Sequence, residues 1–125
     1  GAGGAGGAVP DMSVSTHFLD AFSGQRGVRA SLVVSAVDGI AIESNLQMGE
    51  DGSRVAALAA SLYRKATKSA TAAGLGSTGF LQLEAEDGRL CMLGGEDVIL
   101  VVVTQREANV GLVRVEMLRA AESLA

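Results

Sequence analysis

The spacing of apolar residues changes several times along the chain, and each change marks the boundary of a predicted element. Between residues 13 and 24 these residues recur at helical intervals, which predicts a short amphipathic helix that Ser13 or Ser15 can cap and Gly24 can end. The stripe consists of Val14, Phe18, Leu19 and Phe22. Residues 1–12 before this helix form a Gly/Ala-rich tract, which predicts a flexible tail.

Two runs rich in β-branched residues follow, at 28–37 and 40–46. The pair Asp38-Gly39 separates them, and this dipeptide is typical of a two-residue hairpin loop because both positions tolerate positive φ. We therefore predict a β-hairpin here. The turn also accounts for Asp38, which has no second carboxylate or histidine at the spacing of a metal site or an acid–base pair.

Residues 50–73 form the longest periodic stretch of the chain and predict a long helix. Asp51 or Ser53 can cap its start, and Gly74 stands where a helix C-terminal glycine belongs. The stripe that we expect to face the sheet consists of Val55, Leu58, Ala59, Leu62, Ala66, Ser69, Ala70 and Ala73.

Three more strands, at 78–85, 89–93 and 98–104, are joined by short turns and predict an antiparallel meander. The last of them, VILVVVT, is apolar without alternation, so both of its faces should be covered and the strand should be central in the sheet. A final helix is predicted to follow Asn109, a good N-cap residue. Its apolar stripe consists of Val110, Val113, Met117, Ala120, Ala121 and Leu124.

Together these elements predict one α/β domain, of the α+β kind, over residues 13–125 in the order α-β-β-α-β-β-β-α. The expected architecture is a three-layer sandwich in which helices cover both faces of a five-stranded antiparallel sheet. Hydrophobic residues make up 48% of the chain, but aromatic residues only 3%, and there is no Trp. The core must therefore be built mainly from aliphatic side chains and alanine.

Two glycine-rich segments, GAGGAGGA at 1–8 and GLGSTG at 74–79, match the spacing of a dinucleotide-binding loop. Such a loop binds pyrophosphate only where a strand enters it and a helix leaves it, because the free N–H groups of the helix hold the anion. No strand precedes the first segment, and the second leaves a helix and enters a strand. We therefore predict no nucleotide site and no other cofactor.

Charge and reactive side chains exclude further classes of function. The net charge of −4 disfavours a general nucleic-acid binder, which would have a basic balance. His17 has no second ligand nearby in the sequence, and nothing near Cys91 would lower the pKa of its thiol, so we expect no catalytic residue and no metal site. No apolar run reaches the length of a membrane span, so we expect no membrane insertion and a cytoplasmic location.

The order of elements, together with four segments, resembles a bacterial member of the roadblock, or dynein light-chain, family over about residues 15–125. The segments are VRASLVVSAVDGIAIES, VAALAASLYRKA, the GG pair before the apolar strand, and NVGLVRVEMLRAA. The resemblance implies a non-enzymatic homodimer that regulates or scaffolds a Ras-like small GTPase. A small-molecule sensor that uses a cavity between the sheet and the helices stays open as the alternative.

Two surfaces are candidates for these contacts. The strand at 78–86 has no proline or lysine to protect an edge, and the long helix carries a strip of mainly small residues beside its expected core stripe, so we predict a homodimer built on both. The predicted interface consists of Ala56, Ala60, Tyr63, Thr67, Thr71, Phe80, Gln82 and Glu84. The outer face of the same helix is basic and is the candidate GTPase-binding surface, although a solvated lysine face is the simpler interpretation. Its residues are Arg54, Arg64, Lys65 and Lys68.

Overall fold

The computed structural model describes residues 12–46, 51–95 and 97–124 of the chain. Within them, three helices and five strands follow one another in the predicted order. They are α1 (Met12–Ser23), β1 (Val28–Ser35), β2 (Ala41–Leu46), α2 (Gly52–Ala72), β3 (Phe80–Ala85), β4 (Gly88–Gly94), β5 (Val98–Thr104) and α3 (Val110–Leu124). Of the predicted N-terminal tail, residues 1–11 lie outside the described residues and Met12 belongs to α1.

The five strands form one sheet in the order β2-β1-β5-β4-β3, and all neighbours are antiparallel. β5 lies in the middle, where Leu100 is paired with Val33 on one side and with Leu93 on the other. The prediction of a central, fully covered strand is therefore confirmed, as is the meander of β3, β4 and β5. β2 and β3 form the two edges.

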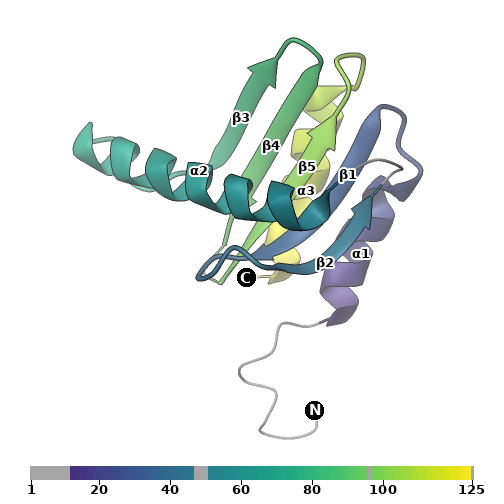
Figure 1. The fold of residues 1–125 in the computed structure, drawn as a ribbon, viewed down its shortest axis with the longest axis horizontal. Helices are drawn as coiled ribbons and strands as arrows, with labels where there is room; N and C mark the ends of the chain where they lie inside the picture. Colours follow the sequence, from purple (N-terminus) through teal and green to yellow (C-terminus); the bar gives the residue numbers. More distant parts are fainter. Residues whose placement is uncertain (1–11, 47–50, 96, 125) are drawn as a thin grey trace, which may run out of the picture.

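Helices cover both faces of the sheet, as predicted (Figure 1). α2 lies across one face, and α1 and α3 lie on the other. The buried side chains form two clusters, one on each face of the sheet. The cluster under α1 and α3 contains Phe18, Leu19, Phe22, Val28, Val33, Cys91, Leu93, Val98, Leu100, Val102, Val113 and Met117. The cluster under α2 contains Ala30, Leu32, Val34, Ala56, Ala59, Ala60, Met92, Ile99 and Val101.

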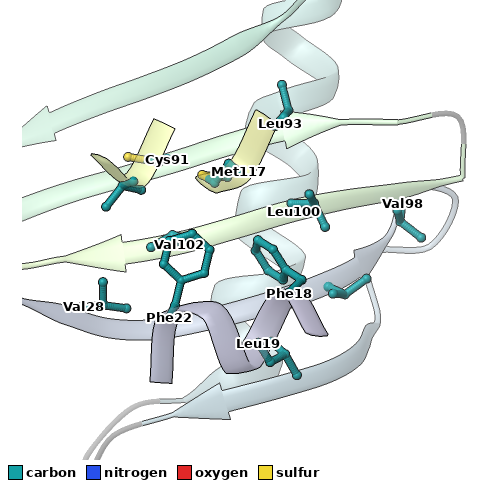
Figure 2. Packing of buried hydrophobic residues seen from close by; sticks show 12 residues of the cluster. Phe18, Leu19, Phe22, Val28, Cys91, Leu93, Val98, Leu100, Val102 and Met117 are labelled. Atoms are coloured by element: carbon teal, nitrogen blue, oxygen red, sulfur yellow. The ribbon is translucent and has the colours of Figure 1, made fainter. Parts of the chain in front are cut away.

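The cluster under α1 and α3 is filled by large side chains, and Figure 2 shows its twelve residues, ten of them labelled. Phe18 and Phe22 extend from α1 toward the sheet, and their rings meet edge to face with 5.2 Å between centroids. Met117 of α3 reaches the same cluster and is fully buried. The predicted stripes of both helices are thus confirmed wherever the side chains are described.

The predicted orientation of α2 is only partly right: Ala59 is buried as expected and Val55 and Leu62 pack against the same cluster, but the buried face is rotated away from Leu58. Leu58, expected in the core, is 61% exposed, whereas Ala56 and Ala60, expected on an uncovered strip, are completely buried against the sheet. The turn and the sheet contact the helix here: a Cβ built on Gly39 would be in van der Waals contact with the Cβ of Ala60, at 3.4 Å, and one on Gly94 would overlap the ring of Tyr63. Ala56 and Ala60 therefore meet the sheet where it lies closest to the helix, and Tyr63 packs over Gly94.

The turn between β1 and β2 is longer than predicted. β1 ends at Ser35 and β2 begins at Ala41, and of the pair Asp38-Gly39 only Gly39 has a positive φ, of 73°. The Asp38 carboxylate accepts a hydrogen bond from the Ile40 N–H at 3.1 Å, which confirms its role in the turn. The expected two-residue loop is wrong because the turn packs against α2 and the β1–β2 register shifts between Val33 and Val34.

The ends of α2 and the start of α3 follow the predicted signals. Asp51 caps α2 by accepting hydrogen bonds from the Arg54 N–H and the Ser53 hydroxyl, and these bonds lower the pKa of its carboxyl. At the other end the N–H of Gly74 donates to the Thr71 carbonyl, with Gly74 in the left-handed region. The Asn109 side chain accepts from the N–H of the third residue after it and caps α3.

Candidate functional site

The outer side of β3 is an open sheet edge. β3 pairs with β4 from Phe80 to Ala85, and within the described part of the chain no strand lies on its other side. Its segment FLQLEA contains no proline or lysine, and four of its six residues are exposed. Gln82 and Glu84 are among them, while Phe80 is half-buried beneath the Arg114 guanidinium, 5.5 Å from the ring centroid. The edge can therefore accept a further strand.

The C-terminal half of α2 extends past this edge. Figure 1 shows its last turns beyond β3, and none of the residues from Ser61 to Ala72 is fully buried. Small residues line this half of the helix, and Leu75, just after it, is 76% exposed. Of the predicted strip, Thr67 and Thr71 lie here. After Tyr63, whose ring still contacts Gly94, the overhanging half of α2 thus carries small residues between its cations, without a strand of the described sheet beneath them.

The same face of the sheet is open at the end of the β3–β4 hairpin. Leu83, which is 42% exposed, is paired with Leu90, and these two residues with Val103 form an apolar floor that α2 does not cover. The floor belongs to a groove of about 350 Å³. Its lining comes from strands and the hairpin turn: Arg29, Leu83, Ala85, Glu86, Asp87, Gly88, Arg89, Leu90, Val103 and Thr104. This is not the cavity between sheet and helices that a small-molecule sensor was expected to use.

Part of the predicted interface lies inside the protein. Ala56 and Ala60 belong to the cluster under α2, so the prediction that they are uncovered is wrong. Tyr63 also faces inward, and its hydroxyl donates a hydrogen bond to the Thr78 carbonyl at 3.1 Å. These three side chains can contribute to an interface only indirectly, through the position of the helix.

The outward face of α2 is basic. From Gly52 to Ala72 the helix contains four cationic side chains and no anionic one, although the whole chain carries a net charge of −4. Arg54, Lys65 and Lys68 are exposed, and Leu58 lies on the same outer face. Arg64 is also exposed but has a structural partner, because its Nη1 donates to the Ala36 carbonyl at 3.3 Å.

The reactive side chains lie apart from one another. His17 is exposed on α1, while Cys91 is completely buried and its burial raises the pKa of the thiol to about 11. Among the residues that the structure describes, no three histidine, cysteine or carboxylate side chains come together as metal ligands. Over the same residues, no helix has the length and apolar character needed to cross a membrane.

Sequence reasoning missed three exposed apolar residues near the basic face. Val37 and Ile40 lie in the turn between β1 and β2 and are 87% and 62% exposed, and Leu58 projects from α2. The Asp-Gly pair indicated the turn, but neither its length nor the direction of its apolar neighbours could be read from the pattern. Leu58 was expected in the core because its side chain is large and apolar.

The sequence is similar to that of known proteins. The family model of the Roadblock/LC7 domain matches residues 17–104. Two uncharacterized proteins of the archaeon Methanocaldococcus jannaschii, MJ1340 and MJ0310, are 36% and 35% identical over 98 residues, which are 78% of this chain and 85% of each relative. The expectation of a bacterial source stays a prediction.

Three solved structures are similar to this chain. MglB of Myxococcus xanthus superposes with a TM-score of 0.80 at 22% identity, covering 91% of this chain and 86% of that one. The gliding protein MglB of Thermus thermophilus gives a TM-score of 0.77 at 21% identity, covering 90% and 87%. A Roadblock/LC7 domain from Streptomyces avermitilis gives 0.75 at 18% identity, covering 89% and 91%. These likenesses establish the fold.

Proposed function

This chain belongs to the Roadblock/LC7 family, and on that premise we propose that it is a non-enzymatic, homodimeric adaptor or regulator of a Ras-like small GTPase. The observation that carries the proposal is a pair of adjoining surfaces: an open edge at β3 and a helix with four cations and no anion beside it. The first surface suits a second copy of the chain, and the second suits an acidic protein partner.

The proposed homodimer pairs β3 with β3 of a second copy about a two-fold axis. Such pairing would satisfy the open backbone groups of both edges and continue the sheet across the two protomers. The half of α2 that extends past the edge of its own sheet would then lie over the sheet of the partner. There it would meet the apolar floor at Leu83, Leu90 and Val103, which α2 of the same chain leaves open. In the proposed homodimer, the overhanging half of α2 from one protomer would thus cover the open apolar floor of the other.

A matched pair of variants tests this dimer. Light scattering behind a sizing column should give the wild type twice the chain mass of 12.6 kDa at micromolar concentration. Leu83→Glu should be monomeric, because it buries an unpaired charge in the interface, whereas Leu112→Glu on α3, exposed to nearly the same extent at 44% against 42%, should stay dimeric. A monomeric wild type, or a fully dimeric Leu83→Glu variant, contradicts the proposed interface.

The basic face of α2 is the proposed contact for the GTPase. Two copies of the helix, side by side on one face of the dimer, would bring eight cationic side chains, four from each chain, to one surface. Such a surface attracts an acidic partner, and the attraction is screened by salt.

Charge reversal tests this contact. The Ras-like GTPases of the source genome can be purified, loaded with GDP or with a non-hydrolysable GTP analogue, and titrated calorimetrically at several salt concentrations. Lys65→Glu/Lys68→Glu should raise the Kd on the order of tenfold and flatten its salt dependence. The control, Arg26→Glu/Arg106→Glu, changes the net charge equally at exposed positions off the helix and should leave the Kd nearly unchanged. Unchanged binding by the Lys65/Lys68 variant would remove the basic face from the proposal.

A further inference from the structure

The turn between β1 and β2 displays two apolar side chains to solvent. Val37 is 87% exposed and Ile40 is 62% exposed, although both follow a strand that is almost entirely buried. Single exposed apolar residues are common on protein surfaces, but a pair on one turn is a small apolar projection. We call these two side chains the turn surface.

Hydrogen bonds hold the backbone of the turn in place relative to β1 and the β4–β5 connection. The N–H of Gly39 donates to the Ser35 carbonyl at 2.9 Å, and the N–H of Ser35 donates to the Ile40 carbonyl at 2.9 Å. The Asp38 carboxylate accepts from the Ile40 N–H, and the N–H of Ala36 donates to the carbonyl of Asp97 at 2.9 Å. The last bond connects the turn to the neighbouring β4–β5 connection.

Two contacts attach the turn to α2 as well. Gly39 is buried against the helix, where a Cβ on it would lie 3.5 Å from the Cα of Ala57 and 3.4 Å from the Cβ of Ala60. The Arg64 guanidinium donates to the Ala36 carbonyl. The turn surface is therefore held in a fixed position relative to the basic helix, and Lys68 follows one helical turn after Arg64.

This arrangement suits binding for an energetic reason. Ordering flexible groups costs free energy on association, and an apolar group that is already held in place avoids most of that cost.

In the sheet order β2-β1-β5-β4-β3, two strands separate the β1–β2 hairpin from the β3 edge. The turn surface therefore lies away from the strand edge proposed for self-association.

We infer that Val37 and Ile40 are the apolar anchor of the GTPase-binding surface and insert into an apolar depression on the Ras-like partner, with partner carboxylates facing the cations of α2. The inference rests on the proposed function. The choice of this occupant rests on charge complementarity, because the helix that holds the turn presents cations without any anion. The two parts of the surface would act differently: the cations through long-range attraction, and the turn surface through close apolar contact.

Salt dependence separates these two contributions. The probe is the Ras-like GTPase that binds the wild type, titrated at about 0.1 M and 0.5 M salt, where screening of exposed charges differs strongly. Val37→Ser/Ile40→Ser should raise the Kd at least tenfold at both salt concentrations, with an unchanged salt slope, an unchanged Tm and an unchanged dimer mass. The control Leu112→Ser/Val115→Ser changes two exposed apolar residues of α3, 44% and 45% exposed, and should leave the Kd as in the wild type.

Three results would overturn the inference. If the Val37/Ile40 variant binds as tightly as the wild type, the anchor is wrong while the proposed function stands. If the variant instead loses its dimer mass, the turn surface is a contact between copies of this chain. If no Ras-like GTPase of the source genome binds the wild type, the proposed function and the inference fall together.

Discussion

The two faces of the sheet are covered by helices that pack in different ways. Under α1 and α3 the space is filled by large side chains, among them Phe18, Phe22 and Met117. Under α2 the helix contributes Ala56, Ala59 and Ala60 to the buried cluster, and the sheet and turn present Gly39 and Gly94 to it. The two faces therefore differ in what their helices contribute: α1 and α3 add large side chains, whereas α2 adds fully buried alanines over large side chains of the sheet such as Met92 and Ile99.

The difference shows what each face can tolerate. A cluster of large side chains loses stability when a side chain is shortened, because a cavity is left behind. A helix that packs through alanines loses little stability when a side chain is shortened, but it loses stability when atoms are added to a buried side chain. Leu58 and the cations of α2 lie on the opposite side of the helix from Ala56 and Ala60, so they are available to a partner.

The largest effect is expected where a large side chain is removed. Phe18→Ala should lower the free energy of unfolding by roughly 3–5 kcal/mol, because the residue is 1% exposed and its ring contacts that of Phe22. Urea denaturation at a fixed protein concentration measures this change. A loss below about 1 kcal/mol, the range of ordinary substitutions, would mean that the face under α1 is not packed as described.

The next effect is expected from enlargement on the opposite face. Ala60→Leu should cost about 1–3 kcal/mol of unfolding free energy, because the side chain is fully buried and the turn at Gly39 leaves it no room. Ala21→Leu, at an exposed position of α1 away from the proposed dimer interface, is the control and should stay within about 0.5 kcal/mol of the wild type. Equal effects of the two substitutions would contradict the close approach of α2 to the sheet.

A smaller effect is expected from pH, on the face with large side chains. Burial raises the pKa of the Cys91 thiol from 9.0 to about 11, so the unfolded chain releases this proton at a lower pH than the folded protein. Stability from this group is complete below pH 9 and is lost as the pH rises from 9 toward 11. By pH 10, one unit above the pKa of the unfolded chain, the loss of unfolding free energy should be roughly 1.4 kcal/mol.

Denaturation of the wild type and of Cys91→Ala at pH 8 and pH 10 isolates this contribution. The wild type should lose more stability than the variant between the two pH values, because only the wild type carries the thiol. A thiol reagent should also react slowly with the native protein at pH 8. Rapid labelling, or equal pH dependence of the two proteins, would show that the thiol is accessible.

The smallest effect is expected at Leu58. Because its side chain is 61% exposed, Leu58→Ala should change the free energy of unfolding by no more than about 0.5 kcal/mol. A buried leucine at the same place would cost roughly 2–5 kcal/mol, so the substitution reports the orientation of α2 directly. Thermal and urea denaturation should agree on the result.

The order of elements was predictable from the sequence, and the orientation of α2 was predictable only in part. The apolar periods of α1 and α3 include large residues such as Phe18 and Met117, whose burial is strongly favourable, so their stripes indicate the correct face. In α2 most apolar positions are alanines, which carry a weak periodic signal, and Leu58 then shifted the expected stripe. What decides the orientation is the fit to Gly39 and Gly94, which are distant in the sequence.

The candidate surfaces, too, could be predicted from the sequence only in part. The exposed cations of α2 and the edge position of β3 could be predicted from charge and strand order. The overhang of α2, the floor at Leu83 and the fixed position of the turn surface could not, because each depends on where one element lies over another. The hydrogen bond from Arg64 to the Ala36 carbonyl spans 28 positions and has no local signal in the sequence.

The pairing of β1 with β5 sets the order in which the protein can fold. Val33 lies beside Leu100, so 67 positions of chain separate two residues that are neighbours in the sheet. During synthesis the β1–β2 hairpin must wait, with one side of β1 unpaired, until β5 has left the ribosome. Contacts between such distant segments slow folding and leave apolar strand edges exposed in the meantime. The middle of the sheet is therefore completed last, and the nascent chain is most prone to aggregation just before β5 arrives.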